Sequence, residues 1–173
     1  MPGVGKSNFS KRLSEIIEWK CKSIDEIIVS RTGMSIEKLF RTHGEKHFRR
    51  IESETLAELA NYDEPLIIDC GGGIILSPKN RALIKEKTLC ITLHDRLDKI
   101  YNRIHSDELE RPLFKNLDYY SFQRKMRKRE SLYEIARIRI NESYVENSHH
   151  FIKNYLSFLT NPYKSVELAI WRE

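Results

Sequence analysis

The chain has 173 residues, of which 40% are hydrophobic and 32% charged, and its formal net charge is +5. This length suits one domain that buries a core, and the composition is that of a globular protein. No apolar run approaches the roughly 20 residues of a membrane-spanning helix, and no signal peptide is recognisable. We therefore expect one cytoplasmic domain with no membrane partner, and we interpret the single cysteines Cys21, Cys70 and Cys90 as reduced core thiols.

The first seven residues match the end of a phosphate-binding P-loop, G-x-x-x-x-G-K-[ST], whose first glycine would stand just before Met1. Backbone N–H groups of Gly3, Val4 and Gly5 would form a nest for phosphate oxygens. Lys6 would reach the β- and γ-phosphates, and the Ser7 hydroxyl would ligate Mg²⁺. The alternative is a glycine-rich start of an ordinary amphipathic helix.

Periodicity predicts alternating helices and strands over the rest of the chain, which indicates a parallel α/β sheet. We expect helices at 6–18, 36–42, 45–61, 79–86, 95–104 and 146–159, and strands at 19–24, 65–70, 89–93 and 137–140. Ser35 is the expected N-cap of the second helix, and Gly44 separates it from the third. The polar stretch 105–118 is expected to be a mobile lid, and 160–173 a loose tail after a domain at 1–159.

The densest basic run is Arg124–Arg129, which we interpret as a solvated helix face with one or two arginines turned toward an anionic substrate. Nucleic-acid binding is disfavoured because the aromatic residues and repeated basic stripes of such modules are missing.

Several motifs occur in order along residues 1 to about 142, and together they resemble the shikimate kinases, small P-loop kinases of aromatic amino-acid biosynthesis. They are Gly3–Ser7, Asp25-Glu-Ile-Ile, Arg31-Thr-Gly-Met-Ser, Phe48-Arg-Arg-Ile-Glu52, Gly71-Gly72-Gly73, Arg111-Pro-Leu and Arg129-x-x-Leu-Tyr133. The resemblance implies a P-loop kinase sandwich: helices around a central parallel sheet of five strands, with a lid over the site. The first strand of that sheet is absent from this chain, and we expect the true start to lie upstream.

The resemblance also implies an activity: transfer of the γ-phosphate of ATP, with Mg²⁺, to the 3-hydroxyl of shikimate by a monomer. In this interpretation Lys6 and the lid residue Arg111 act on the phosphates, Asp25 contacts the reacting hydroxyl as the candidate base, and Arg103 packs near adenine. Shikimate would be held by Arg49, Arg129 and Gly71–Gly73, with Glu52 orienting Arg49.

Each assignment has a plainer alternative. Asp25 could be the N-cap of a helix at 27–30. Arg49 and Glu52 could form an exposed i,i+3 ion pair. Arg111 and Arg129 could each be a solvated surface arginine. The triplet Gly71–Gly73 could be a simple loop, although three glycines directly after a buried strand favour a ligand at that edge.

The chain departs from the family at Ser23, where members usually carry the first aspartate of a D-x-D pair that helps to hold Mg²⁺ through water. Asp69 ends the apolar run Leu66–Ile68 and is a candidate to supply part of that charge; its alternative role is to cap the glycine turn. Other candidate functions are a gluconate-type or nucleoside-type small-molecule kinase, or a non-catalytic nucleotide-binding protein.

Overall fold

The structure, a computed structural model, describes residues 3–106, 114, 116–141 and 145–160. Its helices are α1 (Lys6–Ile17), α2 (Ile24–Thr32), α3 (Ile36–Ala60), α4 (Pro78–Lys87), α5 (Leu97–Ser106), α6 (Tyr119–Glu130) and α7 (Val145–Thr160), with 3₁₀ helices η1 (Ile74–Leu76) and η2 (Ser131–Ile135). The strands are β1 (Lys20–Ser23), β2 (Leu66–Asp69), β3 (Ile91–His94) and β4 (Ile138–Asn141). The predicted alternation of helices and strands is confirmed.

The strands pair in parallel, as predicted, but in two separate half-sheets. β1 pairs with β2, with Ser23 opposite Asp69, and β3 pairs with β4, with His94 opposite Asn141. Within the described residues no ladder joins β2 to β3. The expected single central sheet is therefore divided between these two strands.

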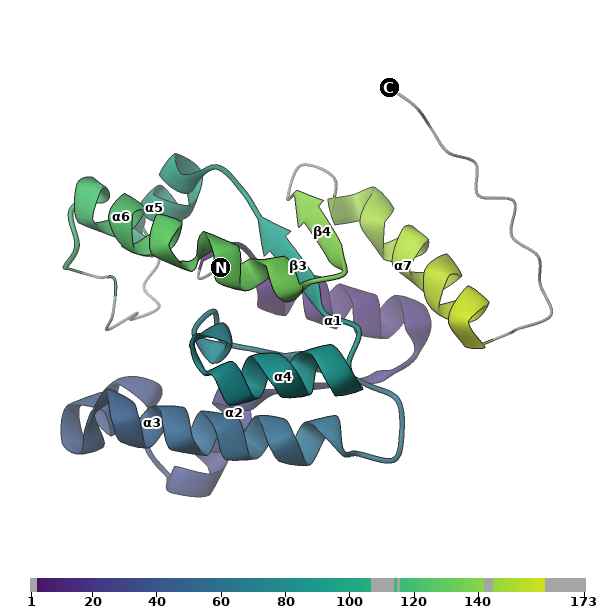
Figure 1. The fold of residues 1–173 in the computed structure, drawn as a ribbon, viewed down its shortest axis with the longest axis horizontal. Helices are drawn as coiled ribbons and strands as arrows, with labels where there is room; N and C mark the ends of the chain where they lie inside the picture. The colour runs from purple at the N-terminus through teal and green to yellow at the C-terminus, as the bar shows by residue number, and fades with distance from the viewer. Residues whose placement is uncertain (1–2, 107–113, 115, 142–144, 161–173) are drawn as a thin grey trace.

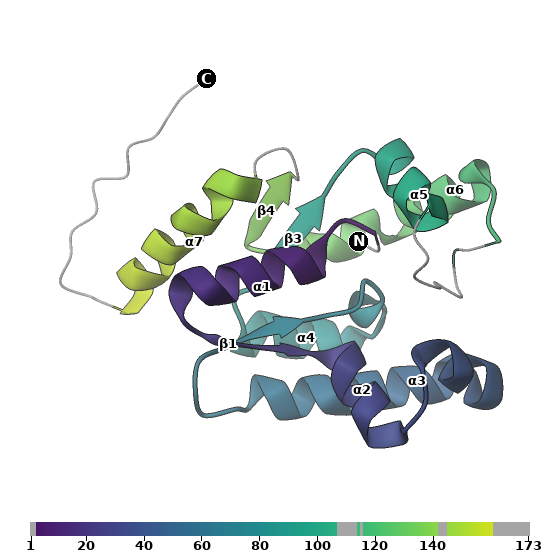
Figure 2. The same cartoon turned by 180° about the vertical axis from the view of Figure 1, so that it is seen from behind.

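Helices cover both faces of the strands (Figures 1 and 2). α1 and α7 pack together on one face, α4 lies on the other, and α2 and α3 pack together beside β1 and β2. Each half-sheet has its own buried cluster. One is centred on Phe122, Ile100 and Ile152, the other on Ile24, Ile28 and Leu56.

Helix ends near the strands are set by short polar residues and glycine. The Ser23 hydroxyl accepts a hydrogen bond from the Glu26 N–H, so Ser23 is the N-cap of α2 and the capping alternative for Asp25 is wrong. Ser35 caps α3 as predicted, accepting from the Lys38 N–H. Gly44 interrupts that helix with φ 78°, which confirms the predicted break between its two segments.

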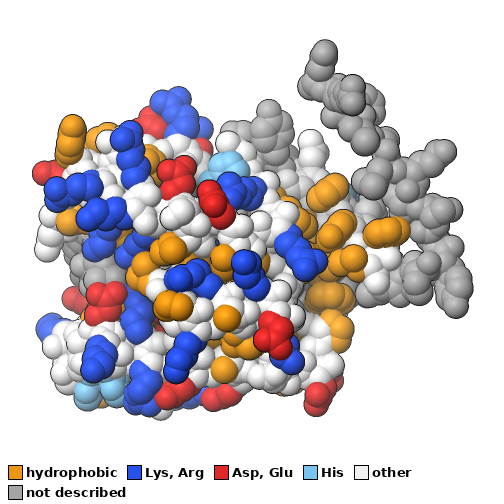
Figure 3. Space-filling model, in the orientation of Figure 1, with side chains coloured by type: hydrophobic (Ala, Val, Ile, Leu, Met, Phe, Trp, Pro, Cys, Tyr) orange, Lys and Arg blue, Asp and Glu red, His pale blue; other side chains and the backbone are white. Residues whose placement is uncertain are grey.

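The face in Figure 3 carries acidic and basic side chains side by side, and no described helix is long and apolar enough to span a membrane. Exposed apolar side chains on α7 include Phe151 and Leu159. Most of the predicted lid (107–113 and 115) and nearly all of the predicted tail (161–173) lie outside the described residues.

Candidate active site

The P-loop turns directly into α1. Gly3 and Gly5 have φ of 71° and 83°, a left-handed conformation that glycine adopts without strain. A Cβ on Gly3 would also lie 2.8 Å from Cγ1 of Ile104, so the position has no room for a side chain. Lys6 and Ser7 form the first turn of α1, whose N-cap Gly5 provides no side-chain hydrogen bond. The leading N–H groups of this helix are thus arranged as in an anion site.

Arg49 is held by two carboxylates on its own helix. Its Nη1 donates to Oε2 of Glu52 at 2.7 Å, and its Nε and Nη2 donate to Oε1 of Glu45 at 3.2 Å. Only 1% of the Glu52 side chain is exposed, so the interpretation of Arg49 and Glu52 as a surface ion pair is wrong. Burial raises the pKa of Glu52, and the neighbouring Arg49 opposes that rise.

The glycine triplet that follows β2 packs against this pair. A Cβ on Gly73 would lie 2.5 Å from Cζ of Arg49, so the guanidinium covers that residue. A Cβ on Gly71 would lie 3.2 Å from Oε1 of Glu52 and 3.6 Å from Oδ1 of Asp25. Asp25, in the first turn of α2, therefore faces Gly71 beside Glu52, and its charge adds to the rise in the Glu52 pKa.

Arg129 approaches the same place from α6. It is buried (7% exposed), which rules out a solvated arginine, and desolvation, with Arg49 as a further cause, lowers its pKa. Tyr133, from η2, contacts Arg129 and donates from its hydroxyl to the Gly72 carbonyl at 2.8 Å. Burial raises the pKa of Tyr133 to about 12, so its hydroxyl keeps its proton at neutral pH.

Asp69 ends β2 on the strand next to Ser23. The two residues are register partners in a parallel ladder, so their side chains leave the same face of the half-sheet at the same level. Asp69 is 9% exposed, and within the described residues its carboxylate makes no hydrogen bond or ion pair. The glycine turn is closed instead by the Ile74 N–H bonding to the Gly71 carbonyl, so the capping role proposed for Asp69 is not seen there.

Arg103 comes from α5 and is not part of this group. Nη2 of Arg103 forms an ion pair with Oδ2 of Asp95 at 3.3 Å, in which Asp95 is nearly buried. Arg111 belongs to the part of the lid outside the described residues.

Sequence reasoning overlooked Glu45, Asp95 and Tyr133 as members of the site region. Tyr133 did end one of the recognised motifs, which was a signal that it had a function. Glu45 could have been found from its i,i+4 spacing to Arg49. No comparable pattern points to Asp95, because its partner Arg103 lies eight residues away on α5.

The arrangement places two arginines, one of them desolvated, around a strip of bare backbone at the carboxyl end of β2. The charge of Arg49 contributes to the lowered pKa of Arg129, and two cations this close favour an anion between them. Asp25 lies on the other side of the same glycines and can accept a proton. The site therefore suits a small molecule that carries a carboxylate and a hydroxyl, with the P-loop available for phosphate.

Comparisons with known proteins show what the chain is similar to. A family model described as shikimate kinase matches residues 2–160. A shikimate kinase of Geobacter sulfurreducens is 34% identical over 140 residues, which cover 80% of this chain and 76% of the relative. One from Streptococcus thermophilus is 40% identical over 116 residues, covering 66% of this chain and 69% of the relative.

Solved structures show the same fold. A shikimate kinase from Acinetobacter baumannii in complex with shikimate is 27% identical, with a TM-score of 0.81 over 94% of this chain and 92% of that one. A shikimate kinase from Aquifex aeolicus is 24% identical, with a TM-score of 0.77 over 91% of this chain and 93% of the other.

Proposed function

Because this chain belongs to the shikimate kinase family, we propose that it transfers the γ-phosphate of ATP to the 3-hydroxyl of shikimate, giving shikimate 3-phosphate and ADP. The observation that carries the proposal is the convergence of Arg49 and Arg129 on Gly71–Gly73, with Asp25 beside them. A nucleoside carries no carboxylate, so a nucleoside-type kinase has no need for two carboxylate-binding arginines, whereas gluconate does carry one and has to be separated from shikimate by the choice of acceptor.

In this proposal the two arginines bind the substrate carboxylate. A guanidinium presents a planar fork of donors that matches a carboxylate, and Glu52 with Glu45 fixes the Arg49 fork in place. Tyr133 positions Arg129 and ties it to the glycine turn through the Gly72 carbonyl. The carboxylate therefore orients the ring, so that one hydroxyl faces Asp25.

Replacing Gly73 with alanine should weaken shikimate binding and leave the fold intact. The φ of Gly73, −95°, suits any residue, so the only obstacle is the contact between the new Cβ and the Arg49 guanidinium. Displacing that guanidinium removes charged hydrogen bonds worth about 1.5–3 kcal/mol, so the KM for shikimate should rise about 10- to 100-fold. Steady-state kinetics with each substrate varied would measure it, and the KM for ATP should not move.

The matched control is Gly33→Ala, at a glycine with φ 64° and open space around it. It should lose stability through backbone strain but keep the KM for shikimate. If the KM for shikimate changes equally in the two variants, the effect of Gly73→Ala does not come from displacing the Arg49 guanidinium.

The phosphates of ATP would be bound by the N–H groups of Gly3, Val4 and Gly5 and by Lys6 and the first turn of α1. We propose that the lid at 105–118 carries Arg111 over these phosphates, where its charge stabilises the transition state. We also propose that Arg103, oriented by Asp95, lies beside adenine.

Kinases of this chemical class use a divalent cation that neutralises charge on the transferring phosphoryl group. Mg²⁺ takes one or two protein oxygens and keeps water and phosphate oxygens as its other ligands. The residues present fit that pattern, since Ser7 offers a hydroxyl at the P-loop and Asp69 a buried carboxylate without a protein partner in the described part of the chain. We propose that Asp69 supplies the charge that an aspartate at position 23 would otherwise provide.

Replacing Asp69 with asparagine should weaken metal binding in the ADP complex. Loss of a carboxylate that acts directly or through water typically costs about 10- to 100-fold in metal affinity. Binding of Mn²⁺ to the protein with ADP, followed by electron paramagnetic resonance, would measure this without turnover. Asp63→Asn is the matched control because Asp63 is exposed in the turn before β2. Unchanged Mn²⁺ affinity in the Asp69 variant would contradict the assignment.

We further propose that the enzyme works as a monomer in the cytoplasm. Its three cysteines carry no disulfide, as is usual in a reducing compartment. Sedimentation at micromolar concentration would test the monomer, and fractionation of the source cells would test the location.

The activity itself is tested by shikimate-dependent release of ADP, with gluconate and nucleosides as the other acceptors. The assay should be run on this chain and on a form carrying a P-loop glycine and an apolar strand before Met1. ADP release that requires shikimate in either form supports the proposal. A folded protein that binds ATP and releases no ADP with any acceptor would favour the non-catalytic alternative, and release with another acceptor would favour a different kinase.

A further inference from the structure

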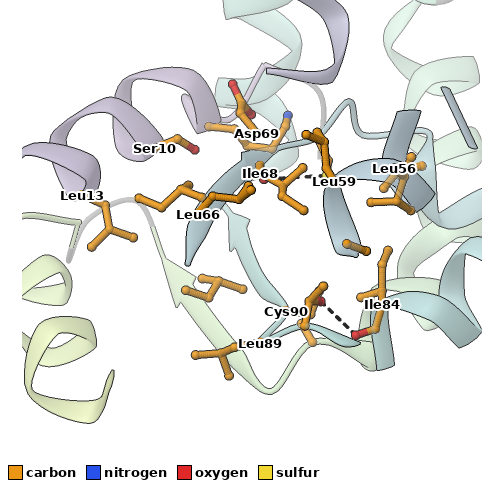
Figure 4. Close-up of a pocket in the computed structure, with 18 of the residues that line it drawn as sticks. Ser10, Leu13, Leu56, Leu59, Leu66, Ile68, Asp69, Ile84, Leu89 and Cys90 are labelled. Atoms are coloured by element: carbon orange, nitrogen blue, oxygen red, sulfur yellow. Dashed lines mark hydrogen bonds between the residues drawn. The ribbon is translucent and has the colours of Figure 1, made fainter. Parts of the chain in front are cut away.

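A cavity of about 570 Å³ lies between the two half-sheets, with Leu13 of α1 and Leu66 and Ile68 of β2 along it (Figure 4). Its walls are mostly apolar, and it belongs to the division of the sheet described above. A second cavity, of about 290 Å³, lies between the β3–β4 half-sheet and α6, and several of the side chains that line it are charged. We call this second cavity the charged pocket.

The charged pocket is built by one face of the half-sheet and one turn of α6. Thr92 of β3 lies opposite Arg139 of β4 in the parallel ladder, and His94 follows Thr92 on the same face. Arg127 and Glu130, one helical turn apart on α6, line the other side. Figure 3 shows acidic, basic and histidine side chains gathered near the carboxyl end of β3. Groups of both signs therefore meet at this pocket.

These charged groups do not pair with one another. Residues spaced i,i+3 on a helix can reach each other, yet no ion pair joins Arg127 to Glu130 in the part of the chain that the structure describes. Among the same described residues, the side chains of Arg139 and His94 also make no hydrogen bond or ion pair. The pocket therefore keeps two guanidinium groups and one carboxylate available to a ligand.

The rest of the wall is apolar or already engaged. Leu97 and Met126 provide apolar surface. Asp95 also lines the pocket, but its nearly buried carboxylate is paired with Arg103 at 3.3 Å, so Glu130 is the acid that remains for a cation. Pockets for drug-sized ligands measure about 300–1,000 Å³, so a cavity of about 290 Å³ suits a smaller molecule.

A ligand with a carboxylate, an ammonium group and a short apolar side chain would match all of these walls together. The planar fork of Arg127 or Arg139 suits a carboxylate, and the Glu130 carboxylate suits an ammonium group. An exposed ion pair contributes little by itself. A ligand with only one of the two charges would therefore bind more weakly than one with both.

The charged pocket also adjoins the site proposed for shikimate. Tyr133 lines the pocket, donates a hydrogen bond to the Gly72 carbonyl at 2.8 Å and contacts Arg129. Arg127 and Glu130 stand on the same turn of α6 as Arg129. A ligand that binds these two side chains therefore acts on the turn that positions Arg129.

We propose that the charged pocket binds a free amino acid with an apolar side chain, and that this binding is linked to shikimate binding through Tyr133. Arg127 and Arg139 hold its carboxylate, Glu130 holds its ammonium group, and the apolar wall contacts its side chain. The link to shikimate rests on the proposed function, whereas the binding site does not. Because such a link is reciprocal, each ligand changes the affinity of the other by the same factor.

The test titrates the isotope-labelled chain with L-leucine and follows the amide resonances by nuclear magnetic resonance. The amides of Thr92, His94, Arg127 and Arg139 should shift, with a Kd of about 1 mM or lower. The ligand controls are 4-methylpentanoate, which lacks the ammonium group, and 3-methylbutylamine, which lacks the carboxylate. Each should bind about 10-fold more weakly or worse, because one set of charged hydrogen bonds is lost.

Absence of shifts up to about 10 mM L-leucine, ten times that Kd, overturns the proposal, and so do shifts that map to another part of the chain. Equal binding of 4-methylpentanoate also overturns it, because the pocket would then be a site for simple anions.

Variants of the pocket test the same assignment. Arg139→Gln and Glu130→Gln should each weaken L-leucine binding about 10- to 100-fold and leave turnover without leucine unchanged. Arg124→Gln and Glu134→Gln, at exposed residues outside the pocket, are the matched controls and should bind L-leucine normally. Equal losses of affinity in all four variants would contradict the assignment.

The link to shikimate has its own readout. Saturating shikimate should change the Kd of L-leucine about fivefold or more. Tyr133→Phe keeps the ring in the pocket wall but removes the hydrogen bond to Gly72, so it should retain L-leucine binding and lose most of that change. A Kd that shikimate at saturation does not alter would overturn the link. A chain that binds L-leucine in the pocket but does not bind shikimate would support the pocket and contradict the proposed function.

Discussion

Arg49→Met should lower kcat/KM for shikimate by about 30- to 1,000-fold and destabilise the protein by about 3–5 kcal/mol near neutral pH. The first effect follows from losing a charged hydrogen-bonding pair with the substrate carboxylate, worth about 2–4 kcal/mol. The second arises because Glu52, with 1% of its side chain exposed, would become a buried charge without its main partner. Steady-state kinetics and urea unfolding would measure the two effects separately.

The destabilisation should depend on pH in a definite direction. Burial already raises the pKa of Glu52 in the folded protein, and removing Arg49 takes away the main opposing influence. A carboxyl whose folded pKa lies above its unfolded value costs no stability below the unfolded pKa, about 4.3, and costs progressively more as the pH rises through the folded pKa. The deficit of the variant should therefore be small near pH 4 and grow toward pH 8.

Arg50→Met is the matched control for this variant. Arg50 is the next residue of α3 and pairs with Glu54 at 2.8 Å, but both side chains are more than half exposed. Exposed pairs of this kind contribute about 0–1 kcal/mol, so the control should change neither stability nor kinetics appreciably. If the two variants lose the same stability, or if the deficit of Arg49→Met does not change with pH, Glu52 does not carry the buried charge inferred for it.

Much of the fold could be predicted from local sequence. The apolar runs before Asp69 and after Leu89 identify β2 and β3 because strands buried on both faces need continuous hydrophobic residues. Ser35 and Gly44 were interpreted correctly because capping and left-handed glycine depend on a few adjacent residues. The N-cap of α2 is Ser23, two positions before Asp25, which was the alternative that the sequence suggested. Local sequence could not separate the two residues because serine and aspartate cap helices equally well.

Sequence motifs predict which residues belong to the site, but not how those residues contact one another. They include Arg49, Glu52 and Gly73. They do not show that the Arg49 guanidinium lies over Gly73 and leaves no room for a side chain there. Burial of Arg129 could not be inferred, because it stands in a run of six residues with five basic side chains that would also suit a solvated helix face. The division of the sheet depends on pairing between segments far apart in sequence, which no local pattern reports.

Asp25→Asn should lower kcat by about 10²- to 10⁴-fold, the usual range for removing a general base, with smaller changes in either KM. The amide keeps the size of the carboxylate and can still hydrogen-bond a hydroxyl, but it cannot take the proton as that hydroxyl attacks phosphorus. Its position beside Gly71 should be preserved, since the contact to that glycine depends on shape. Single-turnover kinetics with ATP in excess of KM would isolate the chemical step from product release.

Glu26→Gln is the control for this variant, because Glu26 is the neighbouring acid in the first turn of α2 and is exposed. It removes the same charge from the same helix end, so it accounts for any effect through the helix dipole. A drop of less than tenfold for Asp25→Asn would assign Asp25 to orienting the substrate, since a loose phosphoryl-transfer transition state can proceed with little help from a base. A large drop confined to Asp25→Asn would instead show that proton acceptance at this position contributes several kilocalories per mole to the rate.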